Sequence, residues 1–245
     1  HKIKRLVDHM FVILPFEKEF YEKFNYKVDY VGNPLRDAIA QFKPDGNFLQ
    51  KHQLNLEKKL VAILPGSRYQ EVTMLLDRMV EVAFDFPQVQ FVIAAVSNLD
   101  SAIYEPYKRN NVRIVTDETY DLLLHSRAAV VASGTATLET CLFNVPQVVC
   151  YRLNSISYSI AKMVLSVKYI SLVNLIVDKP VVKELIQGEC TIKNIRKELE
   201  HLIHDSNARN IMLAGYQEVS DRIGETGVSQ KTASLIASYM KPEEV

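Results

Sequence analysis

The chain alternates between short apolar runs and longer stretches in which apolar residues recur every three or four positions. From Lys59 onward the apolar runs are continuous, which is typical of strands buried on both faces of a parallel sheet. The expected strands are Lys59–Leu64, Val89–Val96, Val112–Val115, Ala128–Ala132 and Pro146–Tyr151. Helices are expected between them at Glu71–Phe84, Leu122–Ser126 and Thr137–Phe143. The pattern predicts an α/β fold with a doubly wound parallel sheet covering about Leu56 to Leu153.

The two ends of the chain follow other patterns. Three helices are expected to close it, at Lys193–His204, Ala208–Asp221 and Ser229–Met240. The first fifty residues predict a strand at His9–Pro15, a helix at Glu17–Phe24, an extended segment at Lys27–Val31 and a helix at Pro34–Phe42. A strand and a helix without sheet partners cannot bury both faces. We therefore expect residues 1–42 to be the remnant of an N-terminal domain with its linker, and residues 43–245 to form a second domain with closing helices.

Composition narrows the class of protein. Of the 245 residues 48% are hydrophobic and 24% charged, which is ordinary for a globular protein, and 29 Lys+Arg balance 29 Asp+Glu. Zero net charge argues against a general nucleic-acid binder. No apolar run reaches the roughly 18 residues of a membrane-spanning helix, and no signal peptide is seen. The three cysteines and six histidines lack metal-ligand spacing, so the cysteines are expected to be reduced and packed as small apolar residues.

A first candidate site follows the expected strand Lys59–Leu64, in the sequence Leu64-Pro65-Gly66-Ser67-Arg68. In an open parallel sheet, ligands bind beyond the carboxyl ends of the strands. Gly66 would allow close approach of the backbone, and the amides at the start of the next helix would point at an anion. Arg68 could pair with a phosphate through two hydrogen bonds. The alternative is an ordinary strand-to-helix turn in which Arg68 forms a surface ion pair.

A second turn of this kind follows Ala128–Ala132, in Ser133-Gly134-Thr135-Ala136-Thr137-Leu138-Glu139. Hydroxyl side chains around a glycine at a helix start offer amides and hydroxyls to an anion. Glu139 lies about one turn into the helix and would suit a vicinal diol such as a ribose, because a carboxylate accepts two hydroxyl hydrogen bonds. The alternative is that Ser133 or Thr135 only caps the helix and that Glu139 is an acid favoured by the helix dipole.

A third group of polar residues lies in Val173-Asn174-Leu175-Ile176-Val177 and after Pro180. Asn174 interrupts an apolar run, and a buried amide needs hydrogen-bond partners. Pro180 is expected to begin a helix that carries Glu184 and Gln187 three positions apart. The alternative is a loop asparagine beside solvated helix residues.

Together these motifs resemble the lipid-A-disaccharide synthase family. The shared pieces, in the family's order, are Val31-Gly32-Asn33-Pro34-Leu35-Arg36-Asp37, the turn at Gly66 with Glu71-Val72, the turn at Gly134, and Asn174-Leu175-Ile176 with Glu184-Leu185. The resemblance runs from about His9 to the last helix. Single pieces recur in other GT-B glycosyltransferases and in nucleotide-sugar epimerases, whereas the combination is specific.

The resemblance implies two Rossmann-like domains facing each other across a cleft, of which this chain holds the C-terminal, UDP-sugar-binding one. It implies an inverting hexosyl transfer from UDP-2,3-diacylglucosamine to 2,3-diacylglucosamine 1-phosphate. The products would be the β-1,6-linked lipid A disaccharide and UDP, made peripherally at the cytoplasmic face of the inner membrane of a bacterium with an outer membrane. No metal and no cofactor are implied. The implied donor-site residues are Gly66, Ser67, Arg68, Ser133, Gly134 and Thr135 at the diphosphate, Glu139 at the ribose, and Asn174 and Glu184 in the donor pocket.

The chain departs from the family in two ways. Asn33 stands where the family often has His at the domain junction, so a hydrogen-bonding role survives there and one that needs imidazole does not. The family is also longer at the N-terminus by about one Rossmann-like domain, which is expected to hold the acceptor site, the general base and the main membrane-contacting surface. We therefore expect this chain to bind UDP without catalysing transfer by itself.

Other functions stay open at this stage. One is a different GT-B UDP-sugar transferase or a UDP-sugar 2-epimerase, although no set of catalytic acids matching an epimerase is seen. Another is a non-catalytic nucleotide-sugar-binding module that works with a separate partner chain. An exposed, unpaired half-domain at His1–Phe42 would favour association or aggregation.

Overall fold

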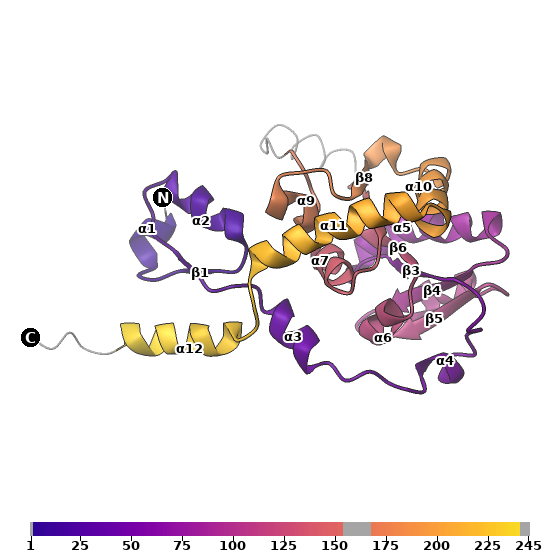
Figure 1. Ribbon diagram of the computed structural model, residues 1–245, viewed down its shortest axis with the longest axis horizontal. Helices are drawn as coiled ribbons and strands as arrows, with labels where there is room; N and C mark the ends of the chain where they lie inside the picture. The colour runs from indigo at the N-terminus through magenta and orange to yellow at the C-terminus, as the bar shows by residue number, and fades with distance from the viewer. Residues whose placement is uncertain (1, 154–167, 241–245) are drawn as a thin grey trace, which may run out of the picture. The chain divides into compact units, whose positions relative to one another are not determined.

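The computed structural model describes residues 2–153 and 168–240, and the chain forms two compact units. One unit comprises His1–Lys43 with Gln217–Val245, and the other comprises Pro44–Tyr216 (Figure 1). The first boundary between the units follows Lys43, one residue later than the boundary expected from the sequence. The last helical segment groups with the N-terminal residues, whereas the sequence analysis placed it in the second domain.

The unit Pro44–Tyr216 is built on a six-stranded parallel sheet with the order β5-β4-β3-β6-β7-β8. Its strands are β3 Leu60–Leu64, β4 Gln90–Ala95, β5 Val112–Thr116, β6 Ala128–Ala132, β7 Gln147–Tyr151 and β8 Lys183–Ile186. The five strands that the apolar runs predict are confirmed to within one residue at either end. The doubly wound α/β class is confirmed with them.

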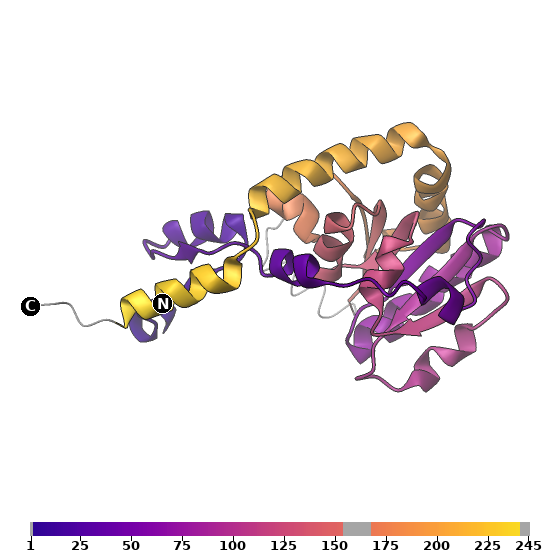
Figure 2. The ribbon, with the colours of Figure 1, turned by 60° about the horizontal axis from the view of Figure 1, so that its bottom comes forward.

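Both faces of this sheet are buried, as the continuous apolar runs require. Val61 and Ile63 of β3 face one core, which α5 (Tyr69–Glu81) and α10 (Ile192–His204) cover. Ala62 and Leu64 face the other core, which includes residues of α4 (Phe48–Lys51) and α6 (Thr119–Leu124). The helices on either side of the sheet can be followed in Figure 2.

The strand order places a reversal in the middle of the sheet. From β3 the chain proceeds outward to β4 and β5, then returns to the opposite side of β3 and continues through β6, β7 and β8. The turns that leave β3 and β6 therefore lead in opposite directions from neighbouring strands. Such a switch point opens a crevice beyond the carboxyl ends of the strands.

The helices that follow β3, β5 and β6 are α5, α6 and α7 (Thr135–Leu142). Each begins two or three residues earlier than predicted, because its first residues lie outside the apolar stripe on which the prediction rests. Short 3-10 turns lie at Val82–Asp85, Ser101–Ile103, Glu105–Tyr107 and Gln187–Glu189. The closing helices α10, α11 (Ser206–Ile223) and α12 (Val228–Tyr239) are confirmed to within two residues.

The helix expected from Pro180 is wrong. Lys183–Ile186 is strand β8, which pairs in parallel with β7 so that Glu184 lies opposite Val149 and Leu185 opposite Cys150. The helix of this region lies earlier, as α9 (Leu172–Val177), and Ser171 caps it by accepting a hydrogen bond from the amide of Asn174. A free strand edge on β7 outweighed the three-residue spacing of Glu184 and Gln187, which is a weak helical signal.

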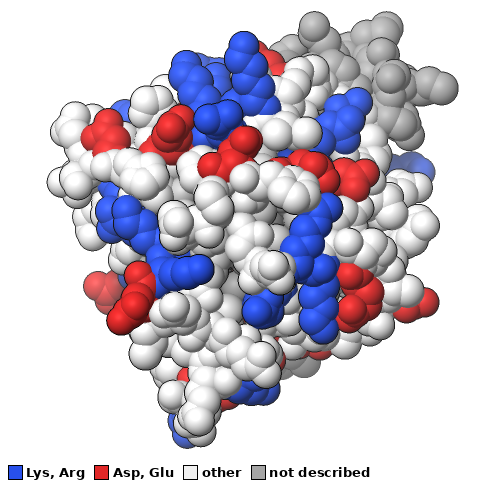
Figure 3. Space-filling view, turned by 90° about the vertical axis from the view of Figure 1, so that its right-hand side faces the viewer, with Lys and Arg blue, Asp and Glu red and all other residues white. Residues whose placement is uncertain are grey.

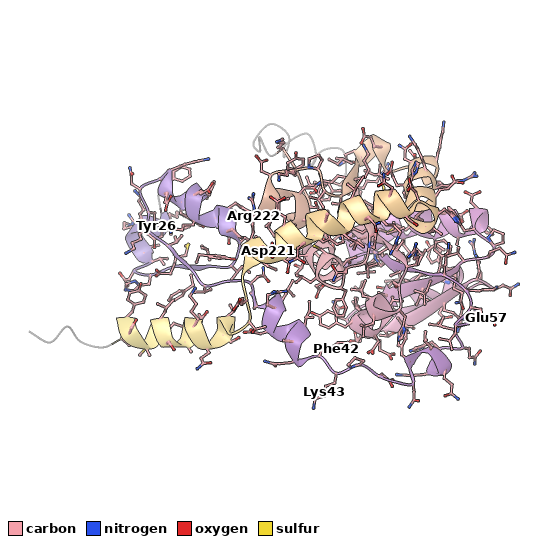
Figure 4. All side chains as sticks on the ribbon, viewed as in Figure 1. Tyr26, Phe42, Lys43, Glu57, Asp221 and Arg222 are labelled. Atoms are coloured by element: carbon pink, nitrogen blue, oxygen red, sulfur yellow. The ribbon has the colours of Figure 1, made fainter. Side chains whose placement is uncertain are left out.

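The unit formed by the two ends of the chain has a small sheet in which β1 (Phe11–Val12) pairs in parallel with β2 (Asp29–Tyr30). Its N-terminal helices are α1 (Lys2–Leu6), α2 (Pro15–Glu22) and α3 (Leu35–Gln41). Tyr26, labelled in Figure 4, donates from its hydroxyl to the carbonyl of Val7 at 2.8 Å. Asn33 is buried, donates from its amide to the carbonyl of Ile13 and accepts a hydrogen bond from the amide of Leu35.

Hydrogen bonds between distant residues explain why Gln217–Val245 belongs to this unit. The Asp37 carboxylate accepts from the amides of Gly227 at 2.6 Å and Ser229 at 2.9 Å. The Tyr30 hydroxyl donates to the carbonyl of Ile223 at 2.9 Å. Gly32, with φ of 101°, lies against Val228, so that a Cβ there would come within 2.9 Å of a Val228 methyl.

The surface carries both signs of charge. Figure 3 shows one face on which Lys and Arg side chains lie beside Asp and Glu side chains. Ion pairs of this kind join Arg109 to Glu81 and Arg196 to Asp85. Within residues 2–153 and 168–240, no helix has the length and apolar character needed to cross a bilayer.

Candidate functional site

A cavity of about 260 Å³ lies at the switch point of the sheet, beyond the carboxyl ends of β3 and β6. It brings together the two turns that the sequence analysis selected, including Gly66, Ser67, Arg68, Ser133, Gly134, Thr135 and Glu139. The remaining lining residues are Leu64, Glu71, Ala94, Val96, Thr119, Ala132 and Ala136. The two turns therefore form one site, as their position on a shared sheet edge predicts.

The first turn requires glycine at position 66. Gly66 has φ of 105°, and a Cβ there would lie 2.6 Å from Oε2 of Glu71 and 3.0 Å from its Cβ. Arg68, the residue before α5, has an extended backbone and does not cap the helix with its side chain. Because the first amides of a helix have no partners within the helix, this turn directs donors and the positive end of the helix dipole towards the cavity.

The second turn also depends on its glycine. Gly134 has φ of 156° and ψ of −159°, a region that is essentially restricted to glycine. Apart from its chain neighbours, none of the residues that the structure describes has an atom within 4 Å of a Cβ built there. Thr135 is exposed at the start of α7. Ser133 differs from expectation in detail, because its hydroxyl donates to the carbonyl of Ile170 at 2.9 Å.

Arg68 supplies positive charge at the mouth of the cavity. Its guanidinium donates to Glu71 at 2.8 Å, and the Arg68 side chain is 82% exposed. An ion pair this exposed contributes about 0–1 kcal/mol. The surface ion pair considered as the alternative is therefore present, but it is weak enough for an anionic ligand to displace it.

Glu139 supplies a half-buried carboxylate on the other side of the cavity. Burial raises the pKa of Glu139, and a hydrogen bond from the Tyr120 hydroxyl opposes this rise. The Tyr120 oxygen lies 3.1 Å from Oε1 of Glu139. A carboxylate in this position retains lone pairs that can accept from hydroxyl groups of a ligand.

Asn174 and Glu184 lie outside this cavity and bond to each other. The Asn174 amide nitrogen donates to Oε1 of Glu184 and to the carbonyl of Val182, each at 2.9 Å. The Asn174 oxygen accepts from the amide of Val182. Glu184 in turn accepts from the amides of Ile170 and Ser171. The pair therefore fixes the segment at Ile170. The carbonyl of Ile170 in turn accepts the hydrogen bond from the Ser133 hydroxyl.

Sequence reasoning missed Tyr120, which contacts Glu139 from α6. The two residues lie 19 positions apart on different helices, and Tyr120 precedes the apolar stripe from which α6 was predicted. A polar aromatic residue four positions after the end of β5 was the available signal. The three cysteines, by contrast, are free and buried as expected. Among the residues that the structure describes, no three His, Cys, Asp or Glu side chains gather as a metal site would require.

Solved structures place this fold in a class. The S. aureus protein MnaA, solved with UDP, superposes with a TM-score of 0.68 at 14% identity, over 98% of this chain and 63% of that one. CalG4, the calicheamicin glycosyltransferase, gives a TM-score of 0.58 at 18% identity, over 95% of this chain and 55% of that one. A UDP-N-acetylglucosamine 2-epimerase gives a TM-score of 0.60 at 16% identity, over 98% of this chain and 60% of that one. The fold is the Rossmann-like one of GT-B glycosyltransferases and these epimerases.

Comparison of the sequence identifies one family among the proteins that share this fold. Residues 1–237 match the family described as lipid-A-disaccharide synthetase, and the chain belongs to this family. The lipid-A-disaccharide synthase of Anaeromyxobacter sp. (strain K) is 35% identical over 248 residues, which cover 98% of this chain. The chain spans 64% of the length of that relative. The resemblance carried by the turns at Gly66 and Gly134 is confirmed.

Proposed function

We propose that this chain binds the nucleotide-sugar donor of a lipid-A-disaccharide synthase. In this proposal the whole enzyme is an inverting hexosyltransferase that joins UDP-2,3-diacylglucosamine to 2,3-diacylglucosamine 1-phosphate and releases UDP. The observation that carries the donor assignment is the cavity at the switch point, where two glycine turns, two helix N-termini, Arg68 and Glu139 meet. Membership of the family supports the reaction.

The donor is oriented by charge. We place the diphosphate at the turns Gly66-Ser67-Arg68 and Ser133-Gly134-Thr135, where backbone amides and helix dipoles favour an anion. Arg68 exchanges its pair with Glu71 for one with a phosphate. Glu139 accepts the hydroxyl hydrogen bonds of the ribose. We place the sugar beside the segment that Asn174 and Glu184 hold at Ile170.

The proposed transfer follows from this orientation. The acceptor hydroxyl attacks the anomeric carbon from the face opposite UDP while the bond from that carbon to the UDP oxygen breaks. Arg68 and the two helix N-termini stabilise the negative charge that develops on the leaving UDP. A general base must take the proton of the acceptor hydroxyl, and we place it, with the acceptor site, in the part of the enzyme that precedes this chain.

We further propose that the enzyme works peripherally at the cytoplasmic face of the inner membrane. Both substrates of the proposed reaction are lipids. The unit formed by the chain ends also exposes Leu6, Phe20 and Phe24 at 69%, 52% and 57%. Lys4 and Lys23 lie nearby in the sequence, and apolar side chains beside basic ones suit the surface of an anionic bilayer.

Calorimetric titration with UDP tests the donor assignment. With EDTA present, we expect UDP to bind selectively over GDP and ADP. Arg68→Ala should weaken UDP binding by about 1–3 kcal/mol, the scale of a lost charge-assisted hydrogen bond. Arg196→Ala is the matched control, because Arg196 is a half-exposed arginine of α10 that pairs with Asp85 and does not line the cavity. Absence of UDP binding by the folded chain, or equal affinities of the two variants, would contradict the proposal.

A further inference from the structure

The carboxylate of Glu139 is held by a residue from the other half of the sheet. Tyr120 is the second residue of α6, which packs against β4 and β5, whereas Glu139 lies on α7, which packs against β6 and β7. Their hydrogen bond, 3.1 Å long, therefore spans the switch point. Thr119, which precedes Tyr120, lines the same cavity.

The Tyr120 ring is itself anchored. It packs against Phe143, with 4.9 Å between the ring centroids and an interplanar angle of 47°. Phe143 follows α7 and lies four residues beyond Glu139, so the ring contact and the hydrogen bond both join Tyr120 to the same helical segment. The hydroxyl is therefore directed at Glu139 by packing as well as by charge.

The hydrogen bond from Tyr120 stabilises the ionised form of the Glu139 carboxylate. Among the described residues, the charged side chains that line the cavity are Arg68, Glu71 and Glu139, and Arg68 is paired with Glu71. Across residues 2–153 and 168–240, no basic side chain forms an ion pair with Glu139. Burial raises the pKa of Glu139, and the Tyr120 hydrogen bond lowers it, since it stabilises the ionised form.

We propose that Tyr120 is a positioning residue that holds the Glu139 carboxylate to receive the ribose hydroxyls, and that the pair selects ribonucleotides over 2′-deoxyribonucleotides. One lone pair of the carboxylate is used by Tyr120, and the others remain for the 2′ and 3′ hydroxyls of the ligand. This inference rests on the proposed function, because it takes the ligand of the cavity to be a nucleoside diphosphate.

The test compares UDP, 2′-deoxyuridine diphosphate and pyrophosphate in calorimetric titrations. Tyr120→Phe removes the hydroxyl and keeps the ring that packs on Phe143. We expect it to weaken UDP binding about 3- to 10-fold, the scale of one hydrogen bond, and to leave pyrophosphate binding unchanged. In a Glu139→Gln background the same change should have little effect. Tyr107→Phe is the matched control, because its hydroxyl donates to Asp77 away from the cavity.

A pH profile separates positioning from a purely structural role. As the pH falls through the pKa of Glu139, the carboxylate gains a proton and loses acceptor capacity, so UDP binding should weaken relative to pyrophosphate binding. In Tyr120→Phe the ionised form has lost its hydrogen bond, so this weakening should begin at a higher pH than in the wild type. In Glu139→Gln the ratio of UDP affinity to pyrophosphate affinity should stay constant over this pH range.

The outcomes distinguish the two proposals. If the wild-type chain binds UDP and 2′-deoxyuridine diphosphate equally well, the ribose role of Glu139 in the proposed function is wrong. Suppose instead that the wild type binds UDP more tightly than 2′-deoxyuridine diphosphate. If Tyr120→Phe then has the same ratio of these two affinities, and its UDP binding weakens at the same pH as in the wild type, the role of Tyr120 is overturned. The inference is supported if Tyr120→Phe discriminates less between the two nucleotides and its UDP binding weakens at a higher pH than in the wild type, while Tyr107→Phe shows neither change.

Discussion

At Gly66 the backbone angle and one neighbouring side chain together exclude other residues. Its φ of 105° is unfavourable for an L-residue, and the Glu71 carboxylate occupies the space in which a Cβ would lie. The same glycine brings the backbone of the turn to the cavity wall. Glycine thus avoids backbone strain at a position where the turn lines the cavity.

We predict that Gly66→Ala destabilises the chain by about 1–3 kcal/mol, because alanine is strained at positive φ and must displace Glu71. Gly46→Ala is the control, since Gly46 has no positive φ and, in the described part of the chain, only its own neighbours have atoms within 4 Å of an added Cβ. Urea unfolding of the two variants provides the comparison. Equal midpoints would mean that the turn relaxes without cost.

At the scale of elements, α9 and β8 are joined by one buried side chain. Asn174 is 1% exposed and exchanges two hydrogen bonds with the backbone of Val182 while donating a third to Glu184. A helix and an edge strand that are separated by a short turn are thereby fixed to each other. The interrupted apolar run around Asn174 thus marks a junction between elements.

We predict that Asn174→Ala lowers the free energy of unfolding by about 2–4 kcal/mol, because it leaves buried backbone groups of Val182 without partners. Asn110→Ala, at an exposed position, should change it by less than about 0.5 kcal/mol. Thermal or urea unfolding measures both variants. Loss of UDP binding by Asn174→Ala at unchanged stability would instead assign Asn174 to direct ligand contact.

At the scale of the whole molecule, one unit is assembled from both ends of the chain. Asp37 accepts hydrogen bonds from the amides of Ser229 and Gly227, and these bonds lower the pKa of Asp37 below its ordinary value of 3.8. A lowered pKa in the folded state means that the ionised form stabilises this unit. That contribution is present above pH 3.8 and is lost as the pH falls through the folded value.

We predict that Asp37→Asn accelerates proteolysis within residues 1–43 at neutral pH and leaves residues 44–216 protected. The difference from the wild type should shrink as the pH falls through the lowered pKa of Asp37, because the wild-type side chain then becomes neutral, as the asparagine of the variant already is. Asp221→Asn is the control, since Asp221, labelled in Figure 4, accepts from the Gln217 side chain on its own helix. Hydrogen exchange gives the same comparison. Equal rates for all three proteins at neutral pH would show that Asp37 does not join the two ends.

The sequence by itself determined the central strands, the two glycine turns and the seven cavity residues that they carry. Continuous apolar runs such as Ala128–Ala132, and a glycine followed by an amphipathic helix, depend on residues within one strand or one turn. Only the tertiary structure decided that Lys183–Ile186 is a strand, that Asn174 and Glu184 bond to each other, that Tyr120 donates a hydrogen bond to Glu139, and that Gln217–Val245 joins the N-terminal residues. The physical reason is distance along the chain: the partners of Glu139 and Asp37 lie 19 and 190 positions away, beyond the reach of any local periodicity.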